Sequence, residues 1–448
     1  MALNNGNGTD TTMLVSPAYG FGGGNGGGLF GGGDSWLGIL FLIALALASV
    51  MAFSLAACGG GGGDEVATVA GTPISGDTIK IGVFEPTTGE NGGGGMQEVL
   101  GMRYANTVAP TVDINGVTYN IELVEVDNQS DKTAAVTAAQ SLISSGVVGV
   151  LGSYGSGVSI AAGQTFAEAG VPAIGCSCTN PQVTLGNDFY FRTCFLDPFQ
   201  GTVMASYAAV DQGYKTAAVI SQNGDDYSTG LAAYFKQAFE SLGGTIVADE
   251  TYQTNESDFN AILTSVKESG AEVVFIPSSI ATATLILPQA QANGVTAQII
   301  ASDTWENESI VMAAGSAAEG VVFSTFFDEN DESTPLAKDF VAGFKAYLNS
   351  DPQNITLNGG TDGVAAVSAL GYDAYMSMYE ALKALDGVEG DLTSVNVRDA
   401  LVNVNFGGVT GSISFDENGD ANKDAAYLKQ VVDGKFAFVK KQLDETAQ

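Results

Sequence analysis

Short apolar runs alternate with amphipathic stretches from Thr78 onward, and this alternation limits the possible folds more than any other feature of the chain. The runs of strand length are Ile79–Phe84, Tyr119–Asp127, Val147–Leu151, Val171–Ile174, Thr216–Ile220, Thr245–Tyr252, Glu272–Ile276 and Gln298–Ala301. The stretches with helical spacing are Met96–Asn106, Thr133–Ile143, Ser159–Ala169, Tyr227–Leu242, Phe259–Ser269 and Ala281–Asn293. Because right-handed crossovers place helices on both faces of a parallel sheet, the pattern predicts an α/β fold with two doubly wound parallel sheets.

The segment before this region has the pattern of an export signal. Trp36–Ala57 carries no charge, and its last residues, Leu-Ala-Ala, precede Cys58 and a run of glycines. The pattern predicts cleavage and lipid attachment at Cys58, although the segment is also long enough to remain in the bilayer as a single anchor. No Lys or Arg occurs before Lys80, so the basic start of a signal peptide is missing. We expect a disordered glycine-rich leader at 1–34, a signal or membrane segment at 35–58 and a flexible tether at 59–77.

Length, charge and composition limit the classes of function that are possible for this chain. About 370 residues follow the tether, which suits two domains better than one. The 50 acidic and 16 basic residues give a net charge of −34, which repels nucleic acids. The chain has no histidine and no GxxxxGK(S/T) loop, so a Ser-His-Asp triad, an HExxH zinc site and an NTPase motif are excluded. We therefore expect neither an enzyme nor a cofactor or metal site.

Two smaller features have ordinary interpretations. Asp416–Asp420 resembles part of a calcium loop but lacks the full spacing and the closing Glu, so a turn after the strand Ser412–Phe415 is expected. Besides Cys58, the cysteines are Cys176, Cys178 and Cys194, an odd set without metal-ligand spacing. We expect small buried residues there, and a disulfide among them remains open.

The segments after the third and fourth predicted strands carry small hydroxyl residues. Gly152–Ser159 leads into a helix, whose free N–H groups and positive dipole end attract an anion. Ser156 and Ser159 could instead only cap that helix. After the fourth strand, Ser177 and Thr179 occupy alternate positions of an extended segment and so point the same way. Since ligands of doubly wound sheets bind outside the carboxyl ends of the strands, both loops are expected to face one crevice.

At these positions and others the sequence resembles the extracellular binding proteins of branched-chain amino acid ABC importers, the leucine/isoleucine/valine-binding type. The likeness extends from about Thr78 to Lys441. The segments that carry it are Ile79–Thr88, Gly152–Ser159, Pro172–Thr184, Tyr190–Thr193, Asp197–Gly201, Asp225–Ser228, Ala301–Trp305, Gly371–Ala374 and Ile413–Asp416.

The resemblance implies a set of ligand-binding residues. Ser156 and Thr179 would hold the ligand carboxylate, and Ser177 would offer its main chain. Asp303 would pair with the α-ammonium group, although an acid at this position could also be a helix N-cap before Trp305. Tyr227 would cover the ligand, and Tyr154 is expected to contact it.

The sequence departs from the family in the lining of the side-chain pocket. Serines stand at Ser278 and Ser279, where the family often has a tyrosine, and Gly92 to Gly95 replace a common first-loop aromatic residue. Both departures remove apolar lining, so a ligand more polar than leucine becomes plausible.

The resemblance implies a type I periplasmic-binding-protein fold, with lobe 1 at 78–196 plus 326–408 and lobe 2 at 197–325 plus 409–448. Hinge crossings are expected near Leu196–Asp197, Ser324–Phe327 and Gly407–Thr410. The implied function is that of a monomeric solute-binding lipoprotein on the outer face of the cytoplasmic membrane. It would bind an amino acid, branched-chain or related, and deliver it to the ABC permease. The alternative is a ligand-sensing module of a signalling or chemotaxis system.

Overall fold

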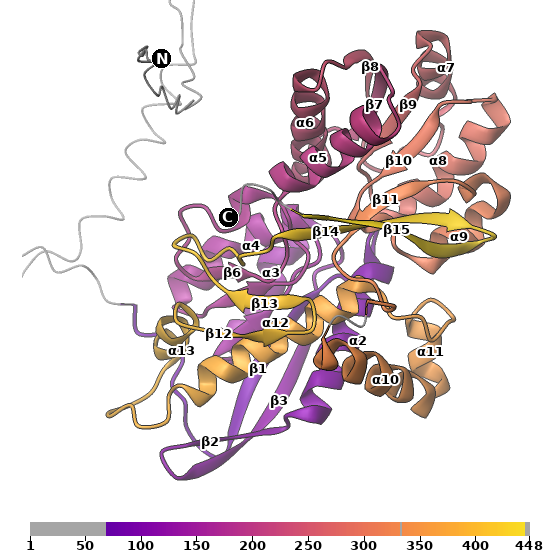
Figure 1. Ribbon diagram of the computed structural model, residues 1–448. Coiled ribbons are helices and arrows are strands. Elements are labelled where there is room, and N and C mark those ends of the chain that lie inside the picture. The colour runs from indigo at the N-terminus through magenta and orange to yellow at the C-terminus, as the bar shows by residue number, and fades with distance from the viewer. Residues whose placement is uncertain (1–68, 332–333, 444–448) are drawn as a thin grey trace, which may run out of the picture. The chain divides into compact units, whose positions relative to one another are not determined.

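Two sheets organise the chain in the computed structural model, which describes residues 69–331 and 334–443 (Figure 1). The predicted leader, the apolar signal segment and Cys58 lie outside the described residues. Within the described ranges, no helix combines the length and the apolar character that a membrane crossing requires.

The first sheet has six strands in the order β2-β3-β1-β4-β5-β6, and every neighbouring pair except β2–β3 is parallel. Its strands are β1 (Thr78–Glu85), β2 (Thr111–Ile114), β3 (Val117–Asp127), β4 (Gly149–Leu151), β5 (Ala173–Gly175) and β6 (Tyr190–Arg192). The helices that pack on it are α2 (Gly92–Val108), α3 (Lys132–Ser144), α4 (Ser156–Ala169) and α12 (Ala366–Lys383). We call this sheet with its helices the first lobe.

Alternation along β1 explains why helices cover both faces of this sheet. Ile81 and Val83 belong to the apolar cluster that contains α2 and α12, whereas Phe84 belongs to the cluster of α3 and α4. Gly82 points to the same side as Phe84, because a Cβ atom there would lie 3.1 Å from Leu142 of α3. Successive residues of a strand face opposite sides, so a strand that is apolar throughout needs cover on both.

The second sheet has seven strands in the order β15-β14-β11-β10-β9-β7-β8 and forms the second lobe. Its strands are β7 (Thr216–Gln222), β8 (Thr245–Tyr252), β9 (Val273–Ile276), β10 (Gln298–Ala301), β11 (Val322–Thr325), β14 (Ala425–Val432) and β15 (Lys435–Leu443). The helices of this part of the chain are α5 (Asp197–Ser206), α6 (Asp226–Ser241), α7 (Asn260–Ser269), α8 (Ile280–Asn293) and α9 (Glu308–Ala314). Strands β7 to β11 are parallel to their neighbours, and β14 and β15, yellow in Figure 1, extend the sheet in antiparallel orientation.

The chain leaves the second sheet after β11 and returns to it at β14. Between them lie α10 (Pro335–Ser350), α11 (Pro352–Leu357), α12, α13 (Ser394–Leu401) and the hairpin β12 (Asn405–Gly408)–β13 (Gly411–Ser414). The hairpin turn lies against the first lobe, because Val409 N and Thr410 N each donate a 2.8 Å hydrogen bond to Asp373 of α12. The predicted third crossing, Gly407–Thr410, coincides with this turn, and the chain joins the second sheet only at Ala425.

Asp416–Asp420 forms a turn, as expected, and ties the end of the chain to the first lobe. Asp420 Oδ1 lies 2.5 Å from Nε of Arg192, whose guanidinium group is fully buried. The same guanidinium group donates to the main-chain oxygens of Cys178 and Asn180, each at 2.7 Å. The acidic turn therefore anchors a structural arginine. The cysteines Cys176, Cys178 and Cys194 are free, buried thiols.

Candidate ligand-binding site

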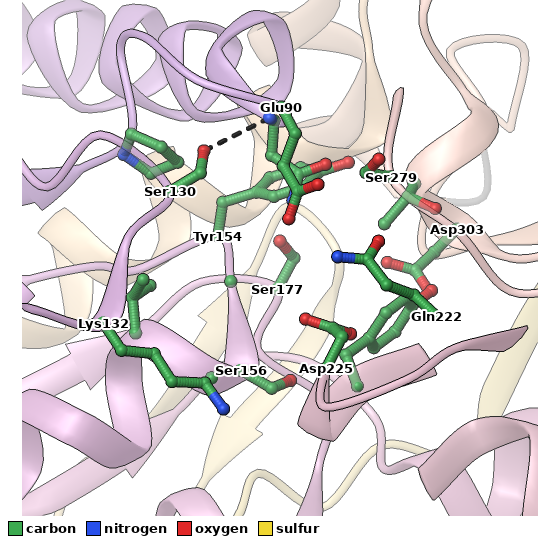
Figure 2. Close-up of a pocket in the computed structure, with 17 residues that line it drawn as sticks. Glu90, Ser130, Lys132, Tyr154, Ser156, Ser177, Gln222, Asp225, Ser279 and Asp303 are labelled. Carbon is green, nitrogen blue, oxygen red and sulfur yellow. Dashed lines mark hydrogen bonds between the residues drawn. The ribbon is translucent and has the colours of Figure 1, made fainter. Parts of the chain in front are cut away.

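The carboxyl ends of strands from both sheets face a single cavity (Figure 2). The volume open to the centres of water-sized spheres is about 50 Å³, and the space free of protein atoms is about 600 Å³ when the opening to solvent is included. Its lining residues are Pro86, Glu90, Asn91, Ser130, Lys132, Tyr154, Gly155, Ser156, Gly157, Val158, Ser177, Gln222, Asp225, Tyr227, Ser279, Asp303 and Thr304. They follow β1, β3, β4 and β5 of the first sheet and β7, β9 and β10 of the second, which is the crevice expected for doubly wound sheets.

One end of the cavity is the start of helix α4. Gly155 is the N-cap residue, and the first helical residue, Ser156, is 2% exposed. Ser156 Oγ accepts a 3.2 Å hydrogen bond from Asn180 N, which leaves the hydroxyl hydrogen free to donate to a ligand. The opening N–H groups of a helix and its dipole favour an anion at this place.

Thr179 and Ser159 lie away from the cavity wall. Thr179 is fully buried, and its carbonyl oxygen accepts a 2.9 Å hydrogen bond from Asp197 N. Ser159 Oγ donates to Gly155 O at 2.8 Å, so this hydroxyl serves the helix itself. Of the hydroxyls predicted to meet a ligand carboxylate, only Ser156 lines the cavity.

Asp303 belongs to another part of the cavity wall, just after β10, and is 3% exposed. Its Oδ1 atom accepts hydrogen bonds from Tyr227 Oη and Gln200 Nε2, each at 2.6 Å. Burial raises the pKa of Asp303 to about 6, and the hydrogen bonds from Tyr227 and Gln200 oppose this shift. The group is thus mainly ionised at pH 7, and Oδ2 remains for a cationic partner.

Tyr154 and Ser177 form the part of the wall in front of two buried carboxyl groups. Ser177 Oγ donates to Glu98 Oε1 at 2.5 Å, and Tyr154 N donates to Glu85 Oε2 at 2.7 Å. Burial raises the pKa of Glu98 to about 7 and that of Glu85 well above its usual range, with the neighbouring carboxyl group adding to the shift at Glu85. The pair therefore holds a proton near neutral pH.

Glu85, Glu98 and Cys176 are the one group of possible metal ligands in the described part of the chain, with ligand atoms within 4.8 Å of one another. Burial also raises the pKa of the Cys176 thiol well above its usual range. A proton held by the carboxyl pair is the simpler way to limit the negative charge here, because all three groups resist ionisation.

The glycines of the first loop make room for Tyr154. Gly92–Gly95 form the first turn of α2, and a Cβ atom on Gly94 would lie 2.4 Å from the Tyr154 ring. A Cβ atom on Gly95 would lie 2.1 Å from the carbonyl oxygen of Pro86. Larger residues cannot occupy these places without displacing the backbone or the ring. The loop after β1 therefore lacks an aromatic side chain, and Tyr154 in the loop after β4 supplies one instead.

Several lining residues were not predicted from the sequence to bind the ligand: Glu90, Asn91, Ser130, Lys132, Gln222 and Asp225. Glu90 is half-buried, and burial together with the nearby Asp225 raises the pKa of its carboxyl group. Burial likewise raises the pKa of Asp225, which caps α6 by accepting from Ser228 N at 2.7 Å. Their position in the sequence could have indicated a place in the cavity wall, because each of these residues ends a strand or follows one closely.

Direct contacts join the lobes around the cavity. Lys132 Nζ lies 2.8 Å from Asp226 Oδ2 and donates to Gly224 O at 3.1 Å. The N-terminus of α8 donates to the first-lobe loop, from Ala281 N to Glu90 O at 3.1 Å and from Ile280 N to the Asn91 side chain at 3.3 Å. A ligand in the cavity would therefore contact both lobes at once.

Comparison with known proteins agrees with this architecture. Residues 78–435 match the periplasmic binding protein family. A leucine-, isoleucine-, valine-, threonine- and alanine-binding protein of Pseudomonas aeruginosa is 28% identical over 357 residues, which is 79% of this chain and 90% of that protein. The crystal structure of a leucine-binding protein from Thermotoga maritima is 31% identical with a TM-score of 0.73, covering 82% of this chain and 99% of that one.

A third similar structure is a branched-chain amino acid transporter substrate-binding protein from Streptococcus pneumoniae in complex with isoleucine. It is 29% identical with a TM-score of 0.71 and covers 82% of this chain and 99% of its own. All three relatives are named as binding proteins and none as an enzyme, and the Streptococcus protein is named as a substrate-binding protein of a transporter. The two solved structures share the fold of this chain. The chain belongs to the periplasmic binding protein family and resembles its branched-chain amino acid binding members.

Proposed function

We propose that the cavity binds a free amino acid as a zwitterion and that the protein delivers it to an ABC permease. The observation that carries this proposal is the opposite polarity of two parts of the cavity wall. Ser156 and the N–H groups of α4 suit a carboxylate, and Asp303, supported by Tyr227, suits an ammonium group. Ser177 and Tyr154 line the cavity with them and complete the proposed set, to which Thr179 would contribute only indirectly.

The proposal includes closure of the lobes on the ligand. A ligand that contacts both walls only when they are together shifts the population from open to closed. The permease would then distinguish the loaded form by the relative position of the lobes. The predicted lobe limits, 78–196 plus 326–408 and 197–325 plus 409–448, remain part of this proposal, with the difference that 409–424 includes contacts to the first lobe before the chain joins the second sheet at Ala425.

Family membership implies a location on the extracellular or periplasmic side, and we propose that a lipid on Cys58 holds the protein there. Cys58→Ser should leave an unlipidated precursor with its apolar segment uncut. Metabolic labelling with a fatty acid tests this, and label retained on the Ser variant would argue against lipid attachment at Cys58.

Thermal-shift screening of the full chain against the common amino acids tests the binding proposal. A ligand that binds only the native state raises the melting temperature by mass action. At least one free amino acid should do so at concentrations well above its dissociation constant. If none does, and uncharged solutes stabilise the protein instead, the amino-acid assignment is wrong.

A further inference from the structure

The cavity contains more carboxylates than a simple zwitterion can pair. Asp303 is proposed for the α-ammonium group, and Glu90 and Asp225 also line the same space. In Figure 2 the labelled side chains of Glu90, Asp225 and Asp303 surround its centre together with Gln222. One ammonium group leaves two of these acidic side chains without a cation from the ligand.

The protein does not supply the missing charge at Glu90. Lys132 is the cationic side chain among the lining residues, and its ammonium group pairs with Asp226. Its Cε atom lies against the start of α4, where a Cβ atom on Gly157 would meet it at 2.9 Å. The Lys132–Asp226 ion pair thus lies beside the start of α4, and Lys132 also favours the charged form of Asp225. At Glu90, Asp225 raises the pKa of the carboxyl group, and Gln222 and Ser279 lower it.

Tyr154 provides an independent sign that a polar group of the ligand belongs near Glu90. The Tyr154 side chain is 5% exposed and lines the same cavity as Glu90. Tyr154 thus adds an aromatic ring and a phenolic hydroxyl to the wall of the cavity. A phenolic hydroxyl can donate and accept a hydrogen bond, so it is suited to a polar group of the ligand.

A neutral aliphatic side chain would bring neither a charge to Glu90 nor a hydrogen-bonding group to Tyr154. Closure over leucine would remove water from the Glu90 carboxylate and the Tyr154 hydroxyl, and the leucine side chain could not replace the hydrogen bonds made by that water. A cationic side chain would form charge-assisted hydrogen bonds with Glu90, and its positive charge would balance the negative charge of the acidic lining residues. The serine at Ser279 and the amide of Gln222 make the same region polar.

We infer that the preferred ligand is an amino acid whose side chain ends in a positive charge, held by Glu90 with help from Asp225 and Tyr154. The inference rests on the proposed function and specifies its ligand class. The α-carboxylate would lie at Ser156, the α-ammonium at Asp303 and the side-chain cation at Glu90.

Calorimetric titration of the full chain with matched pairs of amino acids tests the inference. L-arginine and L-citrulline have nearly the same shape, but only L-arginine has a charged side chain. L-lysine and L-norleucine form a second, less closely matched pair, in which only L-lysine has a charged side chain. We expect at least one cationic member to bind about ten-fold or more tightly than its neutral partner, and more tightly than L-leucine. Glu90→Gln should remove most of this preference.

Glu168→Gln provides the matched control, because Glu168 is an exposed residue near the end of α4 and does not line the cavity. It should keep the preference, which separates local pairing from a change in net charge. Equal binding of each pair, or a preference for leucine, would overturn the inference and leave amino-acid binding intact. A preference that survives Glu90→Gln would contradict the role of Glu90, and no binding of any amino acid would overturn the proposed function itself.

Discussion

The wall of the cavity around Ser156 and the wall around Asp303 are built from different parts of the polypeptide. Around Ser156 the donors are main-chain N–H groups at the start of α4 and one hydroxyl. Around Asp303 the acceptor is a single buried carboxylate, held by the Tyr227 and Gln200 side chains. At the start of α4, several main-chain N–H groups can donate hydrogen bonds to the same anion. At Asp303, a single carboxylate makes the whole interaction with the ammonium group. The two walls should therefore differ in how much a single substitution harms them.

The largest effect is expected from Asp303→Asn. The substitution preserves the shape and removes the charge that faces the ligand ammonium, at a cost of about 1.5–3 kcal/mol in binding free energy. That cost is a ten-fold or greater loss of affinity, which titration calorimetry measures directly. Asp188→Asn is a suitable control, because Asp188 is exposed and does not line the cavity. Unchanged affinity in the Asp303 variant would show that this carboxylate is only structural.

A smaller loss is expected from Ser156→Ala, since the N–H groups of α4 remain. The expected cost is about 1–2 kcal/mol for the free amino acid and close to nothing for the same ligand with an amidated carboxylate. Thr179→Val should cost less than Ser156→Ala, because Thr179 does not line the cavity. If calorimetry shows the acid and the amide weakened equally by Ser156→Ala, this hydroxyl does not bind a carboxylate.

Acid should weaken binding through the Asp303 wall. The pKa of Asp303 is raised to about 6 in this structure, and only its ionised form pairs with an ammonium group. Lowering the pH from 7 to 5.5 should therefore reduce affinity by about four-fold, with recovery as the pH rises. Calorimetry across this range with an amino acid of neutral side chain, whose binding does not depend on the charge of Glu90, should find a much flatter profile in Asp303→Asn. An affinity that rises in acid would contradict an ionised Asp303 as the ammonium partner.

The smallest effect is expected from Lys132→Met, which removes the ion pair with Asp226 between the lobes. The two side chains are 47% and 37% exposed, so the pair should contribute less than about 1 kcal/mol to the closed state. Affinity should fall by no more than about five-fold. Lys236→Met removes the Lys236–Asp249 pair within the second lobe and serves as the control. A loss above ten-fold for Lys132→Met would indicate that Lys132 contacts the ligand itself.

The sequence predicted the elements well where local pattern decides them. Strand β8 occupies Thr245–Tyr252, as the apolar alternation indicates. Helices α2 and α4 begin earlier than predicted, at Gly92 and Ser156, because glycine and serine are weak helix formers and tertiary contacts override that preference. The close approach of Gly94 to Tyr154 depends on two distant loops, so no local pattern could reveal it.

The site was predictable in outline and not in detail. Hydroxyl residues before a helix and an acid after a strand were recognisable because strand ends converge in this fold. That Thr179 would be buried behind the wall and that Glu90 would line the cavity depends on side-chain packing between loops. The same holds for the partners of Asp303, since Gln200 lies 103 positions away in the chain.

The most direct test of the account is a crystal structure of the protein with the amino acid that stabilises it most. We predict the ligand carboxylate at the N-terminus of α4 within hydrogen-bond distance of Ser156 Oγ, and its α-ammonium group against Asp303. A ligand bound in the reverse orientation, or bound without contact to either residue, would contradict the assignment of the two walls.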